Sequence, residues 1–174
     1  MSFERSVNGW REEKDSYFMS GDSPLPENER GRFTGLKYFP PDQEYRVNVK
    51  LQPYLDPQIV TLTTNKGTQQ RFHRVGWFDF EINRKKVRLQ AYRSAEAEDE
   101  RLFVPFRDRT SGRETYGSGR YMDLEPSDSD SYMLDFNAAY NPYCAYSDDY
   151  VCPFPPKENS LDVEIRAGEK KYHD

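Results

Sequence analysis

Apolar and polar residues alternate along much of the chain after Tyr45, and this period of two constrains the fold more than any other feature. Residues 45–52 read YRVNVKLQ, so every second side chain is apolar. Residues 86–91 read KVRLQA and repeat the pattern, while residues 58–64 are rich in β-branched side chains. Such alternation is typical of a strand with one face in the core and the other in solvent. The sequence therefore predicts a mainly β fold.

One long strand, predicted over residues 69–82, contains a fault in its alternation. Two apolar sets lie in opposite phases, namely Val75 with Trp77, and Phe78 with Phe80 and Ile82. Gly76 lies where the phase changes, and a β-bulge at this glycine would explain the change.

Two residues, Asn83 and Arg84, predict a tight hairpin after this strand, although Arg84 replaces the glycine that such turns favour. Further short apolar runs bring the total to about eight strands, and they cover residues 102–106, 121–124, 132–136 and 161–165. Pro105 cannot donate a ladder hydrogen bond, so we expect it on an edge strand or at a strand end. Because a bulge bends a sheet toward closure, we predict an antiparallel barrel-like sheet, with a sandwich as the alternative.

The first 19 residues follow the helical period instead of the period of two. The apolar residues of this one face are Phe3, Val7, Trp10, Tyr17 and Phe18. Gly21 ends the pattern. The length of 174 residues is typical of one domain. We therefore expect a single domain over residues 1–174, in which an N-terminal helical segment (residues 1–40) packs on a β-domain (residues 45–166).

Charge and hydropathy narrow the classes of partner. The net charge of −5 argues against sequence-independent binding to nucleic acid, which needs a basic surface. No window approaches the roughly 20 apolar residues of a membrane span, and the acidic, amphipathic N-terminus is not that of a secretory signal. These features predict a cytoplasmic protein whose partner is neither a nucleic acid nor a membrane. The oligomeric state stays open, with a homodimer as one alternative.

The chain has two cysteines, Cys144 and Cys152. In a reducing compartment we expect two buried thiols, and a disulfide across the loop between them is the alternative. A zinc site is not expected, because neither His73 nor His173 lies at a ligand spacing from the cysteines. The sequence points to no metal and to no particular cofactor.

Two segments are unusually dense in functional side chains. Residues 103–121 place four arginines near three glycines, and residues 136–168 carry four tyrosines, both cysteines and four prolines in a stiff loop. Glycines allow close backbone approach, and arginine forks match carboxylates and phosphates, so the first segment is a candidate anion-binding rim. The alternative is a glycine-rich hairpin loop whose charges are solvated and balanced by Asp108 and Glu114.

The same two segments carry a family resemblance. FVPFRDRTSGRETYGSGRYMDLE and DFNAAYNPYCAYSDDYVCPFPPKENSLDVEIRAGEK resemble an uncharacterised bacterial and archaeal family, domain of unknown function 1684. SPLPENERGRFTGLKYFPPDQEYRV and RVGWFDFEI are also similar to it, so the resemblance covers nearly the whole chain. It implies no particular reaction, but it implies that the two dense segments matter.

From these observations we predict one pocket that binds a small anionic molecule. Its expected ligand-binding residues are Arg107, Arg113, Tyr116, Arg120, Tyr140, Asn141, Tyr143 and Cys144. The arginines would supply paired donors, and the aromatic loop would supply a dry wall. The alternative is a structural role, with Arg107 and Arg120 tied to nearby aspartates.

Two other function classes remain open. An enzyme could use this pocket, with Cys144, Tyr116 or His73 as the reactive group, although His73 lies in the phase of a packed strand residue. A protein-interaction module could instead dock a partner on the aromatic loop. A concave pocket between the two segments favours a ligand or a substrate, whereas a flat aromatic patch favours a protein partner.

Overall fold

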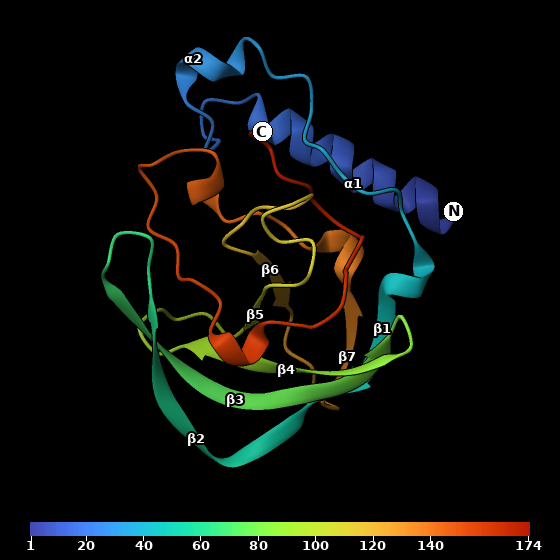
Figure 1. The fold of residues 1–174 in the computed structure, drawn as a ribbon, viewed down its shortest axis with the longest axis vertical. Coiled ribbons are helices and arrows are strands. Elements are labelled where there is room, and N and C mark those ends of the chain that lie inside the picture. Colours follow the sequence, from blue (N-terminus) through green and yellow to red (C-terminus); the bar gives the residue numbers. More distant parts are fainter.

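Seven strands form two antiparallel sheets in the computed structural model, which describes residues 1–174 (Figure 1). The larger sheet has the order β2 (Gln52–Thr63), β3 (Gln69–Ile82), β4 (Lys85–Ser94), β5 (Leu102–Phe106) and β6 (Arg120–Leu124). The smaller sheet pairs β1 (Arg46–Lys50) with β7 (Ser131–Asp135). The helices are α1 (Phe3–Phe18) and α2 (Glu27–Arg30), and four short 3-10 turns follow, η1 (Gln43–Tyr45), η2 (Phe136–Ala138), η3 (Tyr143–Ala145) and η4 (Lys157–Asn159).

The predicted class, a mainly β antiparallel fold with an N-terminal helix, is confirmed. The larger sheet stays open, with β2 and β6 at its two edges, so it is no closed barrel and the structure favours the sandwich-like alternative. Both sheets contribute to one apolar core, since Phe78 of β3 and Leu134 of β7 are both fully buried in it. No helix is both long and apolar enough to cross a membrane.

The predicted β-bulge is present in β3. The pairing of β3 with β4 shifts register between Arg74 and Gly76. A side chain at Gly76 would put its Cβ 2.5 Å from the carbonyl oxygen of Gln52, so only glycine lets β2 approach this closely. The hairpin turn also has the expected form, because Asn83 and Arg84 both have positive φ, of 50° and 64°.

The predicted strand over residues 161–165 is wrong. Its alternation is real, because Leu161, Val163 and Ile165 are buried while Asp162 is exposed. However, the segment joins neither sheet and pairs with the rest of the chain only through loop contacts, such as the parallel bridge of Ser160 with Arg107.

Of the two alternatives for Pro105, the edge strand is wrong, because β5 lies between β4 and β6, but Pro105 does lie one residue before the end of β5. β4 and β5 pair only at Tyr92 and Phe103, and the strands then separate. Asn159 fills the gap with its side-chain amide, which donates to the carbonyl oxygens of Gln90 at 3.0 Å and Pro105 at 2.8 Å. An inserted side chain therefore takes the place of the ladder that proline cannot extend.

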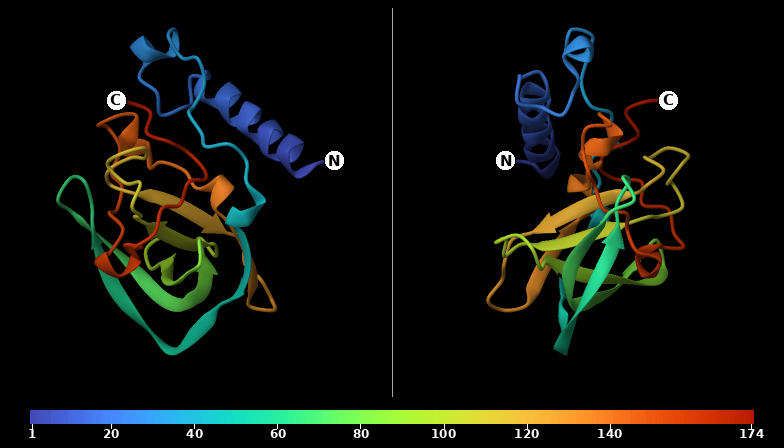
Figure 2. Two further views of the ribbon diagram at one scale, coloured as in Figure 1. Left: turned by 45° about the vertical axis from the view of Figure 1, so that its right-hand side comes forward. Right: turned by 90° about the vertical axis from the view of Figure 1, so that its left-hand side faces the viewer.

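The helix α1 lies outside the sheets, beside the C-terminal segment (Figure 2). A second, smaller core joins it to the aromatic loop, because Phe18 of α1 packs edge-on against Tyr146 with ring centroids 4.9 Å apart. The buried Arg11 donates to the carbonyl oxygen of Phe39 at 2.9 Å and fixes the other side of the helix. Lys14 lies between Arg11 and Phe18 along α1, so these two contacts orient Lys14 toward the aromatic loop.

Candidate functional site

Arg120, predicted to face a ligand, is completely buried. Its guanidinium donates to three carbonyl oxygens of the C-terminal segment, those of Ile165 at 2.9 Å, Glu169 at 3.3 Å and Ala167. It also pairs with Asp108, with 3.5 Å between Nη2 and Oδ2. Burial lowers the pKa of Arg120, and the Asp108 carboxylate opposes this shift. The side chain holds the fold together and offers no surface to a ligand.

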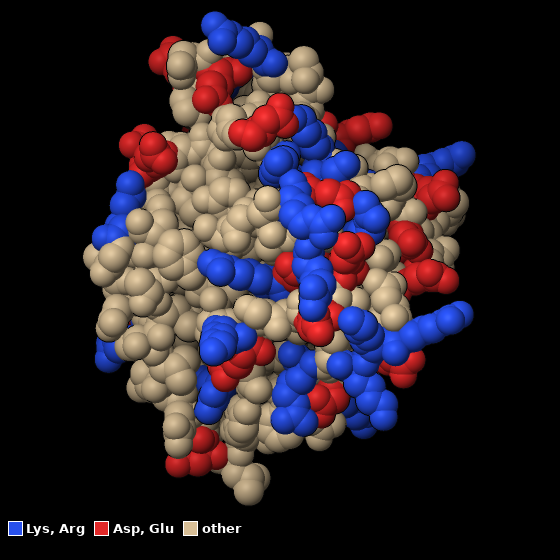
Figure 3. Space-filling model, viewed as in Figure 1, with Lys and Arg blue, Asp and Glu red and all other residues tan.

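The other two predicted arginines lie apart from Arg120. Arg113 is exposed, and its nearest carboxylate is that of Glu164 at 3.7 Å. Cations and carboxylates lie side by side over part of one face of the molecule (Figure 3). Arg107 is half-buried, and its backbone bonds to Asn159 and Leu161. The three arginines thus do not converge on one pocket.

Asn141 is also part of the interior. Its backbone N–H donates to Glu169 Oε2 at 2.7 Å, and its side-chain amide donates to the Lys170 carbonyl oxygen at 3.0 Å. These bonds tie the start of the aromatic loop to the C-terminal segment. The two tyrosines of the loop that were predicted to bind a ligand, Tyr140 and Tyr143, are placed differently, because both line a groove.

This groove has a volume of about 650 Å³. Its walls come from α1, from the ends of β3 to β6 and from the aromatic loop. The lining residues are Lys14, Gln70, Phe72, Ser94, Asp99, Arg101, Phe103, Tyr121, Asp123, Tyr140, Pro142, Tyr143, Tyr150, Val151, Cys152 and Pro153. A volume in this range suits a small-molecule ligand.

Aromatic rings form a continuous floor in the groove. Phe72 and Phe103 stack with centroids 5.5 Å apart, and Tyr121 lies edge-on to Phe103 at 4.7 Å. Tyr140 continues the row, edge-on to Tyr121 at 5.8 Å. Phe103 and Tyr121 lie on the neighbouring strands β5 and β6, so the pairing of these strands sets the spacing of the two rings.

Two cations line the groove, Lys14 and Arg101. Lys14 Nζ lies 2.5 Å from the buried carboxylate of Glu169 and 5.0 Å from the centroid of the Tyr140 ring. Arg101 pairs with Asp99 at 2.9 Å. Each cation uses only some of its N–H donors in these pairs, so both keep donors for a ligand.

The groove is also lined by a carboxylate, that of Asp123. It accepts a hydrogen bond from the Tyr140 hydroxyl. Asp123 is solvent-accessible, but the surrounding groove displaces much of its water, and this desolvation raises the pKa of the carboxyl group. The Tyr140 hydrogen bond and the Arg101 charge oppose the rise.

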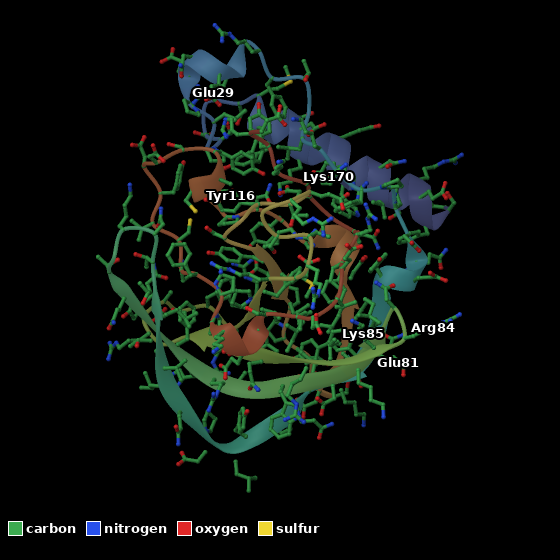
Figure 4. All side chains as sticks on the ribbon, in the orientation of Figure 1. Glu29, Glu81, Arg84, Lys85, Tyr116 and Lys170 are labelled. Carbon is green, nitrogen blue, oxygen red and sulfur yellow. The ribbon has the colours of Figure 1, made fainter.

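The last two predicted residues, Tyr116 and Cys144, lie behind the groove wall rather than in it. The Tyr116 hydroxyl is 3.7 Å from Cys144 Sγ. Tyr116 comes from the loop between β5 and β6, well away from the hairpin tip at Arg84 and Lys85 (Figure 4). Of the two thiols expected to be buried, Cys152 is buried and reaches the groove, whereas Cys144 is only half-buried. His73 lies on β3, opposite Arg93 of β4, and does not line the groove.

Sequence reasoning found the aromatic loop but missed the rest of the groove. Phe103 and Tyr121 are residues of buried strands, and Lys14 lies on a helix far away in the sequence. One signal was present in the sequence. Phe103 and Tyr121 share the strand phase opposite to that of the core residues Val104 and Met122, so their side chains point to the face of the sheet away from the main core.

Comparison with known proteins finds a family and a solved structure, both without a described function. The family described as "Protein of unknown function (DUF1684)" matches residues 31–170. A search of curated proteins gives no match. Among solved structures, the solution NMR structure of an uncharacterized protein of Haloarcula marismortui is 43% identical, with a TM-score of 0.74. The match covers 96% of this chain and 93% of that chain.

Proposed function

The chain belongs to DUF1684, a family of proteins of unknown function, and we propose that it binds a small molecule that combines a flat ring with an anionic group. The ring would lie on the aromatic floor formed by Phe72, Phe103 and Tyr121. The anionic group would accept hydrogen bonds from Lys14 and Arg101. The proposed ligand is anionic, as expected from the sequence, but it binds cations other than the predicted arginines.

The placement of Lys14 is the observation that carries this proposal. A lysine at a groove wall usually keeps its four-carbon chain mobile, at a large cost in entropy when it binds. Here Glu169, only 1% exposed, holds the ammonium group from behind. The cation therefore stands over the Tyr140 ring before a ligand arrives, and this preorganisation favours binding.

Asp123 gives the groove a second, opposite preference. Its carboxylate repels an anion but accepts a hydrogen bond from a hydroxyl or amino group on the ring. A ligand that carries such a group beside its anion fits a groove lined by two cations and one carboxylate. Asp123 would therefore help the groove to select among ring-bearing anions, and it would not strengthen the binding of the anionic group.

The probe for this proposal is 8-anilinonaphthalene-1-sulfonate, which has flat rings and one negative charge. We expect its fluorescence to rise with the folded protein and to fall again when ring-bearing carboxylates or phosphates displace it. Lys14→Met and Arg101→Gln should each weaken the binding about 10-fold or more, because each removes a hydrogen bond to a charged group. Asp123→Asn should strengthen it.

Arg109→Gln is the matched control for Arg101→Gln. Arg109 is also an exposed arginine paired with an aspartate, Asp162, but it lies outside the groove. Near-ultraviolet circular dichroism confirms that each variant is folded. Equal effects of Arg101→Gln and Arg109→Gln, or no displacement by any ring-bearing anion, would refute the proposal.

A further inference from the structure

We infer that a basic depression on the surface binds a small anion that carries a chain of phosphate groups. The depression has a volume of about 530 Å³ and shares no lining residue with the groove. Four of its lining residues are cations, namely Lys37, Arg113, Lys170 and Lys171. The inference does not rest on the proposed groove ligand, because the two sites use different residues.

Three segments that are distant in the sequence bring these cations together. The Lys170 N–H donates to the Lys37 carbonyl oxygen at 2.8 Å, and the Lys171 N–H donates to the Glu114 carbonyl oxygen at 3.1 Å. The C-terminal segment is therefore tied to residues 37–38 through one lysine and to residues 113–114 through the next. Figure 4 shows Lys170 beside α1. Backbone hydrogen bonds, rather than the side chains themselves, thus fix where the cations start.

The two consecutive lysines, Lys170 and Lys171, have no carboxylate partner in the chain. The Lys170 Nζ lies 5.1 Å from the centroid of the Phe39 ring, and this contact leaves its N–H donors free. Both ammonium groups can therefore donate to an anion without first breaking an ion pair.

The other two cations are held only loosely. The Lys37 Nζ is 4.0 Å from Asp174 Oδ1, and the Arg113 Nη1 is 3.7 Å from Glu164 Oε1. Exposed ion pairs contribute little to stability. An anion can therefore replace either carboxylate with little loss.

The carboxylates of the depression do not cancel this charge. Glu114 accepts from Arg166, whose Nη2 lies 2.7 Å from Oε1 and 2.8 Å from Oε2, and Arg166 itself lies outside the depression. Asp174, the second carboxylate of the lining, is 97% exposed. The cations thus outnumber the carboxylates, so the depression attracts an anion of several charges although the whole chain is acidic.

The lining favours phosphate groups over a ring. Tyr38 is the one aromatic residue of the lining, and its ring already faces Arg11, whose Cζ lies 4.2 Å from the ring centroid. No ring is therefore free to stack on a ligand. Lysine and arginine both bind phosphate oxygens, and several phosphate groups in a row can contact cations from all three segments at once. The phosphate chain is thus the part of the ligand that the depression recognises.

Inorganic tripolyphosphate is the probe for the test, and isothermal titration calorimetry measures its binding to the folded chain. The double variant with Lys170→Gln and Lys171→Gln should bind it about 10-fold more weakly or worse, because hydrogen bonds to charged groups are lost. The matched control carries Lys85→Gln and Lys86→Gln, which remove two consecutive lysines at the start of β4, outside the depression. This control should keep the wild-type affinity. Arg113→Gln, at an exposed position, should also weaken binding, and it tests the same site if the double variant does not fold.

A series of anions and of salt concentrations tests the class of ligand. Affinity should rise from phosphate to pyrophosphate to tripolyphosphate, because each added group reaches a further cation. Raising the salt concentration from about 0.05 M to about 0.2 M should weaken the binding of tripolyphosphate, since the contacts lie at the surface. No binding of tripolyphosphate, equal losses in the two double variants, or an affinity that does not change with the number of phosphate groups would overturn the inference.

Discussion

Arg120→Met should destabilise the protein strongly, because it removes a buried cation without leaving a large cavity. In the wild-type chain the guanidinium serves three carbonyl oxygens and the carboxylate of Asp108. Methionine supplies none of these donors. The three carbonyl groups would then lose their donor and the carboxylate would lose its cation, in an interior position from which water is excluded.

The magnitude follows from the cost of breaking a buried ion pair, about 3–5 kcal/mol. Asp108 limits the loss, because its carboxylate still accepts from the Ile165 N–H at 2.6 Å and the Thr110 hydroxyl at 2.9 Å. We therefore expect a decrease of about 4 kcal/mol in the free energy of unfolding, a large part of the roughly 5–15 kcal/mol of a typical domain. The midpoint of thermal unfolding should fall by about 8–16 °C.

Urea unfolding, followed by tryptophan fluorescence, measures this free energy. Arg113→Met is the matched control, because Arg113 lies in the same segment but is exposed; its unfolding curve should overlay that of the wild-type chain. A difference between the two variants of less than about 1 kcal/mol, well below the cost of breaking a buried pair, would refute the structural role of Arg120.

Three further predictions follow from other contacts. Asn159→Ala should lower the free energy of unfolding by about 2–4 kcal/mol, because it leaves the N–H and carbonyl of Gln90 and the carbonyl of Pro105 unpaired; chemical denaturation of this variant and of the exposed control Asn48→Ala measures the difference. Gly119→Ala should cost more than Gly67→Ala: both glycines have positive φ, but only at Gly119 would the new Cβ meet a backbone atom, the Phe106 carbonyl oxygen at 2.5 Å, so equal melting temperatures would contradict the prediction. Binding of 8-anilinonaphthalene-1-sulfonate should strengthen as the pH falls through the raised pKa of Asp123, because protonation removes a negative charge from the groove; fluorescence titrations across this range should show a much weaker pH dependence for Asp123→Asn.

Most of the fold could be predicted from local pattern, because the pattern reflects local physics. The limits of β3, the bulge at Gly76 and the turn at Asn83 and Arg84 each depend on residues close in sequence. The order of strands and the position of β5 inside the sheet depend on contacts between distant residues. Asn159, which makes that position tolerable for Pro105, lies more than 50 residues later.

The groove was harder to predict than the fold because its residues come from every part of the chain. The loop tyrosines were expected from their density in one segment, and Tyr140 and Tyr143 do line the cavity. Lys14 reaches the groove only because α1 packs against that loop through Phe18 and Tyr146. No pattern within the helix distinguishes this lysine from one in solvent.

The burial of Arg120 and the absence of a strand over residues 161–165 have one physical cause. Residues 161–165 alternate as a strand does, but they pair only with the residues that follow β5: Leu161 donates to the Arg107 carbonyl oxygen at 2.8 Å and Val163 accepts from the Arg109 N–H at 2.9 Å. No strand continues this pairing to Ile165. Asp108 instead takes the Ile165 N–H, and Arg120 takes the carbonyl oxygens of Ile165 and Ala167. A guanidinium has five donors and matches carbonyl groups as well as it matches an anion. An arginine near glycines therefore has two uses in a sequence like this one, and the choice depends on whether a later segment without a ladder needs donors.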